Sequence, residues 1–348
     1  MNGKDLRRLS DVADVAKLDL SPGAITLAPT DDGVLAWYSG SYAAGGVRAT
    51  VSHTLDRAVS IAPDEFRQLA TLFDDDAELR LSAEASALAI IAGKRRVTLR
   101  YLNSPDTETY APLQETPELL RCSRADFSRE INFASDVSSV ALTVPILTGL
   151  HLIMSSKLLG VQAANGSSLV FETAIAAQGP AERIDLVTPS SDMLIALRVL
   201  GDASEVAIGV LGKSIVLRTD RAIAKLATLG GAWPAMAQLR TLKFDEETVI
   251  PPALIRSLTL AARAYKASND AIIRNAGSGQ IVLETVAAET GQFQETLAGS
   301  ISRTYTFDVA DLDIAAKLGT EDVDLHLSPT MALVRSGLRK LYINTRTV

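Results

Sequence analysis

One structural unit recurs three times along the sequence: an amphipathic helix, a short turn, and two or three strands. The copy between Ser191 and Thr219 shows the pattern most plainly. Apolar residues at helical spacing lead to Gly201-Asp202, and two alternating apolar stretches follow, separated by Gly212-Lys213. The apolar positions are Met193, Leu194, Leu197 and Leu200 in the helix, and Val206, Ile208, Val210, Ile215 and Leu217 in the strands.

The other two copies lie in the first and last thirds of the chain. The first runs from Phe66 to Leu99 and has the acidic run Asp74-Asp75-Asp76 in its turn. The third runs from Leu312 to Ile343 and turns at Gly319. The copies recur after roughly 115 to 130 residues, an ordinary domain length. We therefore expect three copies of one domain, at residues 1–119, 120–243 and 244–348.

Each expected domain has the order helix, strands, helix, strands. This order predicts an α+β fold with helices on one face of antiparallel sheets. First helices are predicted at 4–17, after Ser123 as N-cap, and after Pro251-Pro252. Hairpin turns are predicted at Asp31-Asp32-Gly33, Asn165-Gly166 and Gly277-Ser278-Gly279, a proline-containing linker at 103–118, and a strand at 297–305.

Composition narrows the class of protein. The chain has 348 residues, of which 47% are hydrophobic and 22% charged, as in ordinary soluble proteins. It contains no apolar run of membrane-spanning length and begins with a charged, amphipathic segment, so we expect a cytoplasmic protein with no membrane partner. Cys122 is the single cysteine, which excludes an intrachain disulfide and a cysteine-based metal cluster.

Enzyme and cofactor signatures are missing from the sequence. His53, His151 and His326 are far apart, and we interpret the last two as exposed strand positions rather than metal ligands or catalytic bases. The Asp74-Asp75-Asp76 run is interpreted as a solvated turn because no second cluster of oxygen ligands accompanies it. Gly277-Ser278-Gly279 precedes a strand-like run, whereas a phosphate loop would precede a helix. We therefore expect no catalytic residue, no metal and no cofactor.

Basic residues recur on the predicted helices, away from the apolar stripe. In the helix after Pro252 we predict Leu254, Leu258, Ala261 and Tyr265 as the buried face. An acidic protein of net charge −7 with cations on one helical surface can hold a polyanion through its phosphates. A solvated helix face is the alternative for any single residue. The candidate DNA contacts are Arg7, Arg8, Arg129, Arg198, Arg256, Arg263, Lys266 and Lys317.

Four phrases of the sequence resemble a known family. They are Pro145-Ile-Leu-Thr-Gly-Leu150, Gly231-Ala-Trp-Pro-Ala235, Phe307-Asp-Val-Ala-Asp-Leu312 and the closing strand Leu341-Tyr-Ile-Asn-Thr-Arg-Thr-Val348. Together with the three-domain plan, they resemble motifs of the bacterial and phage DNA sliding clamp, the β subunit of DNA polymerase III. The resemblance covers nearly the whole chain, and it suggests a divergent member that could be phage-encoded.

The resemblance implies a ring. Two chains of three domains each would join head to tail, with helices lining the hole and sheets outside. Double-stranded DNA would pass through the hole and be contacted without regard to sequence. The protein would catalyse nothing and would give a DNA polymerase its processivity.

The resemblance also implies a pocket between the second and third domains for short peptides of polymerases and clamp loaders. By matching segments, the pocket residues are Leu147, Ala164, Gly166, Leu169, Pro234, Leu239 and Ile343. Core packing is an equally good explanation for Leu147 and Leu169.

Two departures from the family fall on this pocket. The family's T-D-G-H-R-L phrase is Ala164-Asn-Gly-Ser-Ser-Leu169 here, and its M-P-M-R-L end is Asn344-Thr-Arg-Thr-Val348. We therefore predict a lowered affinity for the family's usual peptide motif. Two alternatives stay open: a clamp-like scaffold that recruits repair or other phage factors to DNA without a replicative role, and an enzyme whose scattered Ser, Asp and Arg residues form no recognisable motif.

Overall fold

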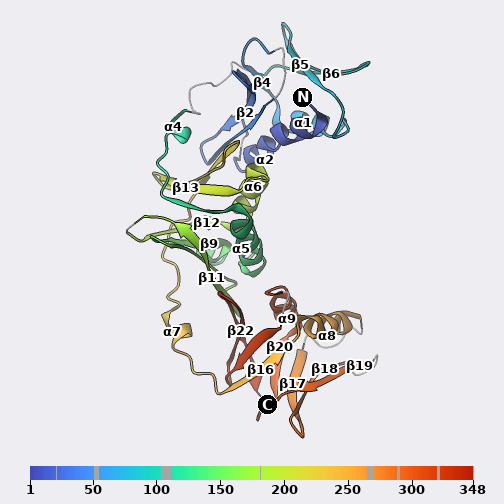
Figure 1. The fold of residues 1–348 in the computed structure, drawn as a ribbon, viewed down its shortest axis with the longest axis vertical. Coiled ribbons are helices and arrows are strands. Elements are labelled where there is room, and N and C mark those ends of the chain that lie inside the picture. Colours follow the sequence, from blue (N-terminus) through green and yellow to red (C-terminus); the bar gives the residue numbers. More distant parts are fainter. Residues whose placement is uncertain are drawn as a thin grey trace. The chain divides into compact units, whose positions relative to one another are not determined.

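The computed structural model describes residues 1–20, 22–50, 55–102, 111–180, 182–264, 270–287, 291–319 and 322–347. The chain forms two compact units, each described by itself below. Unit 1 comprises Met1–Ser128, Ile153–Leu159 and Ala176–Leu229, and unit 2 comprises Arg129–Leu152, Gly160–Ile175 and Gly230–Val348. Both consist of helices packed on antiparallel sheets (Figure 1), so the predicted α+β class is confirmed.

Unit 1 contains the first two copies of the recurring unit. Its helices are α1 (Gly3–Ser10), α2 (Val12–Ala16), α3 (Pro63–Ala70), α4 (Ala111–Gln114) and α6 (Ser190–Leu200). Its strands are β1 (Ile25–Thr30), β2 (Gly33–Ser39), β3 (Ala43–Ala49), β4 (Val59–Ile61), β5 (Arg80–Ala83), β6 (Ala87–Ala92), β7 (Arg95–Arg100), β8 (Leu120–Ser123), β12 (Ile184–Pro189), β13 (Glu205–Leu211), β14 (Ser214–Arg218) and β15 (Ala222–Ala227).

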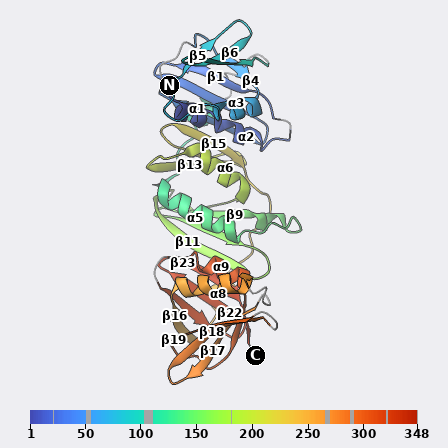
Figure 2. The same cartoon turned by 90° about the vertical axis from the view of Figure 1, so that its right-hand side faces the viewer.

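The sheets of unit 1 are antiparallel throughout. One follows the order β8-β13-β14-β15-β3-β2-β1-β4, and β5-β6-β7 form a separate three-stranded sheet. Helices α1, α2 and α6 contact β3, and α6 also contacts β15, so these helices share one face of the large sheet (Figure 2). The core beneath them includes Leu6, Leu9 and Leu27, all fully buried.

Unit 2 contains the third copy. Its helices are α7 (Ala237–Arg240), α8 (Pro252–Ala264), α9 (Val309–Ala315) and the 3-10 turn η1 (Pro145–Thr148). Its strands are β16 (Glu246–Ile250), β17 (Asp270–Gly277), β18 (Gln280–Ala287), β19 (Gly291–Ala298), β20 (Tyr305–Asp308), β21 (Val323–Leu327), β22 (Met331–Ser336), β23 (Arg339–Asn344) and β24 (Arg346–Thr347). Four elements supply residues to both units: α5 (Arg124–Val137), β9 (Gly149–Met154), β10 (Leu158–Ala164) and β11 (Leu169–Gln178).

Two sheets organise unit 2. One has the order β16-β21-β22-β23 and continues into the first residues of β11, where Leu169 lies opposite Ile343. The other has the order β19-β18-β17-β20-β24. Helices α8 and α9 lie side by side in both views, and α8 also contacts β18 (Figures 1 and 2).

Local signals in the sequence explain several element boundaries. Helix α1 starts with a capping box, because the Asn2 side chain accepts from the Asp5 amide at 2.8 Å and the Asp5 carboxylate accepts from the Asn2 amide at 3.1 Å. The predicted cap of α5 is confirmed, since Ser123 Oγ accepts from the Asp126 amide at 3.3 Å. The three predicted hairpin turns are confirmed as well.

Other predictions about elements were wrong. The helix expected at 4–17 is interrupted at Asp11. The strand expected at 297–305 is absent, because β19 ends at Ala298 and β20 begins at Tyr305. Between them Ile301 is 2% exposed although it lies in a loop, and its carbonyl accepts from Asn275 Nδ2 at 2.6 Å. Ile301 is apolar because it is buried, so it matched the alternating pattern of a strand although it lies in a loop.

The buried face of α8 also differs from the prediction. Ile255, Leu258, Thr259 and Ala262 are buried, whereas Leu254 and Ala261 are only half-buried and Tyr265 lies outside the described residues. The helix has apolar residues at neighbouring positions, so its apolar stripe is broad. Packing on β18 buries only one side of that stripe. In the predicted linker, residues 111–114 form α4, and 103–110 lie outside the described residues.

Candidate functional site

His151 is buried rather than exposed, which corrects the sequence-based expectation. It is 7% exposed, its ring lies 5.2 Å from that of Trp233, and its Nδ1 is 2.9 Å from Gln162 Oε1. His326 is 3.7 Å from Glu247, and His53 lies outside the described residues. The part of the chain that the structure describes contains no group of three or more His, Cys, Asp or Glu residues that could hold a metal ion.

Arg7 and Arg8, both candidate DNA contacts, bind other parts of unit 1. The Arg7 guanidinium donates to the Phe73 carbonyl and pairs with Asp75. The Arg8 guanidinium donates to the carbonyl of Arg198 at 2.7 Å and to that of Val199, in the last turn of α6. A cation at a helix C-terminus satisfies carbonyls that have no partner within the helix. Both arginines therefore have structural partners in addition to any role at the surface.

Arg198 reaches further into solvent. Its side chain is 59% exposed and its Nε lies 3.7 Å from Asp14 Oδ2. Asp14 also lies 3.4 Å from Arg67 and 3.5 Å from Lys17, so one carboxylate is shared by three cations. Arg67 also pairs with Asp11 at 2.6 Å and Lys17 with Asp64 at 3.8 Å, so three carboxylates accompany the three cations of this cluster.

The candidate DNA contacts that the structure describes in unit 2 each have an oxygen partner. Arg263 donates to Asp313 at 2.9 Å, Lys317 to Asp136 at 3.1 Å, and Arg256 to the Ala316 carbonyl at 3.3 Å. Arg129 lies 2.9 Å from Glu130. These pairs join α8 to α9 and join the segment just after α9 to α5, while the side chains of Arg129, Arg263 and Lys317 keep 51–59% of their surface exposed. Lys266 lies outside the described residues.

All seven residues of the predicted peptide pocket belong to unit 2. Leu147, Ala164, Leu169 and Ile343 are at most 7% exposed, Leu239 is half-buried and Pro234 is exposed. Gly166 has φ +83°, and a Cβ built on it would lie 2.9 Å from Leu147 Cδ1. The structure thus brings Leu147 against Gly166, and it pairs Leu169 with Ile343 on neighbouring strands.

The turn before Leu169 is held by one side chain. Asn165 Oδ1 accepts from the amides of Ser167, Ser168 and Leu169 at 2.9–3.0 Å. The Asn344 side chain donates to the Ser167 carbonyl at 2.6 Å, and its amide donates to the Ser168 carbonyl at 2.9 Å. The two segments that depart from the family pattern therefore contact each other.

Glu172 is a buried carboxylate that binds three other side chains, and no sequence pattern pointed to it. It is 9% exposed and accepts from Arg240 at 2.8 Å, from Lys340 at 3.3 Å and from the Tyr342 hydroxyl at 3.3 Å. Burial by itself raises the pKa of Glu172, but hydrogen bonds and positive charge from Arg240 and Lys340 outweigh it and hold the pKa below its usual range. These contacts fix α7 beside β11 and β23.

A second buried pair joins α5 to β23. Arg339 Nε lies 2.9 and 3.1 Å from the two carboxylate oxygens of Glu130, which is 2% exposed. The Arg339 guanidinium also donates to the Leu318 carbonyl and lies 5.2 Å from the centre of the Phe133 ring. Sequence reasoning could not find the pair, because its members are 209 positions apart.

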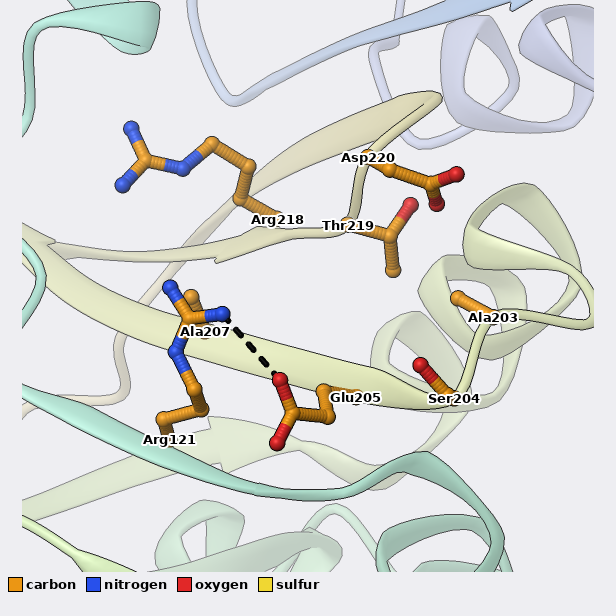
Figure 3. Close-up of a pocket in the computed structure, with 8 residues that line it drawn as sticks. All are labelled: Arg121, Ala203, Ser204, Glu205, Ala207, Arg218, Thr219 and Asp220. Atoms are coloured by element: carbon orange, nitrogen blue, oxygen red, sulfur yellow. Dashed lines mark hydrogen bonds and ion pairs between the residues drawn. The ribbon is translucent and has the colours of Figure 1, made fainter.

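A polar recess of about 350 Å³ opens on β8, β13 and β14 of unit 1 (Figure 3). Arg121 donates to Glu118 at 2.7 Å and to Glu205 at 3.2 Å, and Arg218 donates to the Gln114 carbonyl at 2.6 Å. The hydrogen bonds from Arg121 hold the pKa of Glu118 below its usual range. The acidic and arginine side chains of the recess thus partly neutralise one another. The lining residues are Arg121, Ala203, Ser204, Glu205, Ala207, Arg218, Thr219 and Asp220.

Solved structures similar to this chain are bacterial sliding clamps. The β subunit of DNA polymerase III from Pseudomonas aeruginosa superimposes with a TM-score of 0.82 at 17% identity, covering 100% of this chain and 99% of its own. The Bacillus subtilis sliding clamp gives 0.84 at 15% identity, covering 99% and 97%. The Helicobacter pylori β clamp bound to a DNA ligase peptide gives 0.81 at 13% identity, covering 100% and 99%.

No protein-family model and no curated protein matches the sequence. The similarity is therefore one of structure, and it extends over the whole chain. The described residues contain no helix long and apolar enough to cross a membrane. From its first element to its last, the chain has the α+β fold of the DNA polymerase III β sliding clamp.

Proposed function

We propose that this chain is a DNA sliding clamp, a non-catalytic processivity factor that acts in the cytoplasm. The observation that carries the proposal is the match to sliding clamps over 99–100% of the chain, at TM-scores of 0.81 to 0.84. The helix face would surround double-stranded DNA, and a homodimer of six similar domains would close the ring. The boundaries 1–119, 120–243 and 244–348 belong to this proposal.

The partner site is proposed at the seven apolar residues around Leu147 and Leu169. A polymerase or a clamp loader would dock there through a short peptide. Support comes from the placement of all seven residues in unit 2 and from the exposed Pro234 and half-buried Leu239 at its surface. The Helicobacter pylori relative has a DNA ligase peptide bound.

The proposal is tested by topology. A ring should be retained on circular DNA, because escape requires the ring to open, and it should slide off linear DNA. The purified protein is incubated with nicked circular plasmid long enough for spontaneous ring opening, passed over a sizing column, and treated with a restriction enzyme. Release on linearisation is the expected result. Equal retention on circular and linear DNA would identify an ordinary DNA-binding protein instead.

A clamp-like scaffold without a replicative role is the second candidate. The observation that favours it is the altered pair of segments at 164–169 and 344–348, which contact each other at the proposed partner site. Polymerase extension on primed circular DNA separates the two candidates. A clamp should lengthen the products of the polymerase it serves, whereas a scaffold should be retained on the circle and leave product length unchanged.

A further inference from the structure

The large sheet of unit 1 has an apolar cluster on the face that lies away from its helices. Gly45 of β3 faces helix α2, since a Cβ built on it would lie 3.0 Å from Val15, so the neighbouring Ala44 points to the opposite face. The cluster on that face has side chains that are at most 8% exposed. Strands β2, β3, β14 and β15 supply five members and α4 supplies the sixth: Leu35, Trp37, Ala44, Val216, Ile223 and Leu113.

Residues 111–118, called the strap below, cover this cluster, and two strand residues hold the strap by its backbone. Arg218 donates to the Gln114 carbonyl at 2.6 Å and to the Thr116 carbonyl at 3.5 Å. A Cβ built on Gly209 would lie 2.6 Å from the Pro117 carbonyl oxygen, so a glycine there lets the strap come this close to the sheet. The strap is thus held by one buried leucine and by contacts to its carbonyl groups.

A carboxylate holds the end of the strap, beside the polar recess. Glu118 accepts from Arg121 Nε at 2.7 Å. Ala207 of β13 lies opposite Arg121 on one neighbouring strand and opposite Arg218 on the other, so the two arginines lie on the same face (Figure 3). Both arginines line the recess of about 350 Å³ and both bind the strap. The recess therefore adjoins the strap on the same side of the sheet.

A segment of the same form precedes the last copy of the recurring unit. Helices α4 (Ala111-Pro-Leu-Gln114) and α7 (Ala237-Gln-Leu-Arg240) both have four residues with leucine in third place. Each leucine lies seven positions before the next strand, Leu113 before β8 and Leu239 before β16. Leu113 is 4% exposed, whereas Leu239 is half-buried and belongs to the proposed peptide pocket. Leucines at equivalent places are thus fully buried in unit 1 and partly accessible in unit 2.

We propose that this face of unit 1 is a second peptide site, and that the strap is its built-in occupant. The apolar cluster and the two arginines recognise features that a segment of another protein can also supply. The partner that fits is a peptide with a large aliphatic residue and a carboxylate five positions later, the places of Leu113 and Glu118 in the strap. Such a peptide must displace the strap, whose covalent attachment keeps its local concentration high, so the site is autoinhibited. The inference does not depend on the pocket in unit 2.

The strap itself supplies the probe for the test. A fluorescein-labelled peptide of residues 111–118 is titrated by anisotropy into the full-length protein and into Leu113→Ser, whose built-in strap lacks its anchor. We expect weak binding by the unchanged protein and binding at least about tenfold tighter by Leu113→Ser, because the site is then open. A peptide that itself has Leu113→Ser should bind the opened protein at least about tenfold more weakly. A peptide with Glu118→Gln should lose less than about fivefold, because the ion pair with Arg121 is exposed.

Further variants separate a specific site from a general effect. Leu260→Ser replaces a leucine of α8 that is 63% exposed, and it should bind the peptide as weakly as the unchanged protein. Adding Arg218→Ala to Leu113→Ser should remove most of the gain, because Arg218 donates to the backbone carbonyls of the occupant. If circular dichroism shows Leu113→Ser to be unfolded, Leu113→Ala takes its place, with an expected gain of at least about threefold.

Three results would overturn the inference. Equally weak binding by the unchanged protein and the folded Leu113 variant would make the strap ordinary core packing. A gain that does not respond to Arg218→Ala would place the peptide elsewhere on the protein. A rise in the light-scattering mass of the Leu113 variant above that of the unchanged protein would show that a second copy of the chain covers the opened face. None of these results bears on the ring or on the pocket in unit 2, which have their own tests.

Discussion

At the scale of single residues, Gly166 shows how one position can join backbone conformation to a contact. Its φ of +83° lies in the left-handed region, where a Cβ is unfavourable, and the space beside it is occupied by Leu147. Gly212 has φ +59° in the hairpin between β13 and β14, yet nothing lies within 4 Å of a Cβ built there. A side chain at Gly212 would therefore meet only backbone strain, whereas a side chain at Gly166 would meet both backbone strain and the Leu147 side chain.

Gly166→Ala should destabilise the protein more than Gly212→Ala. Both substitutions cost about 1–2 kcal/mol for a non-glycine residue at positive φ. Gly166→Ala also pushes against Leu147, so we expect an additional loss of about 1 kcal/mol or more. Urea unfolding of both variants measures the difference. Equal losses would mean that Leu147 moves aside freely and is not a fixed wall of the pocket.

Glu172 should make stability depend on pH. Its pKa is lowered in the folded protein, so its contribution is fully present above the unfolded-state value of about 4.3 and is lost as the pH falls through the folded-state pKa. Glu172→Gln removes this titration. The stability difference between the unchanged protein and Glu172→Gln, from urea unfolding between about pH 7 and pH 3, should therefore shrink toward acid. A difference that stays constant or grows toward acid would contradict the ion pairing with Arg240 and Lys340.

At the scale of elements, the helices have basic residues on their exposed sides, but carboxylates accompany many of them. Arg263 of α8 pairs with Asp313 of α9, and Lys317, just after α9, pairs with Asp136 of α5. Each phosphate contact would have to compete with a neighbouring acid. A helix face of this kind would hold DNA weakly, which suits a protein retained on DNA by topology.

Replacing Arg256, Arg263 and Lys266 together by alanine should weaken contact with DNA and flatten its dependence on salt. Each phosphate contact contributes about 0.9 to the slope of log K against log salt, so the slope should fall by at most about 2.7. Anisotropy with labelled duplex DNA across a KCl series measures it, and Arg335→Ala on β22 is the control. An unchanged slope would mean that the three residues do not contact DNA and belong to an ordinary solvated helix face.

At the scale of the whole molecule, two of the edge strands differ in charge. Strand β19 is the edge of its five-stranded sheet and has only exposed or half-buried side chains. Strand β7 is the edge of its three-stranded sheet and contains Arg95, Arg96 and Arg100, whereas β19 has Glu295 and no basic residue. Unpaired edges of opposite charge, one in each unit, can join two chains head to tail.

The dimer should therefore weaken when these edges repel. Light scattering of the unchanged protein should give about twice the chain mass of 37.0 kDa. Arg100→Glu should shift the equilibrium toward monomer at micromolar concentration, because it places an acid against the acidic edge. Arg80→Glu on β5, the opposite edge of the same sheet, is the matched control. A monomer in the unchanged protein would refute the ring, and an unaffected dimer in Arg100→Glu would place the interface elsewhere.

The sequence by itself determined the three-fold recurrence of helix and strands, the hairpin turns and the α+β class, because these depend on local periodicity and turn chemistry. Only the tertiary structure decided which apolar residues are buried, as Ile301 and the face of α8 show, since burial depends on the neighbouring element. It also decided which charges are paired. Arg339 and Glu130 are 209 positions apart, and no local pattern records a contact that long-range packing creates.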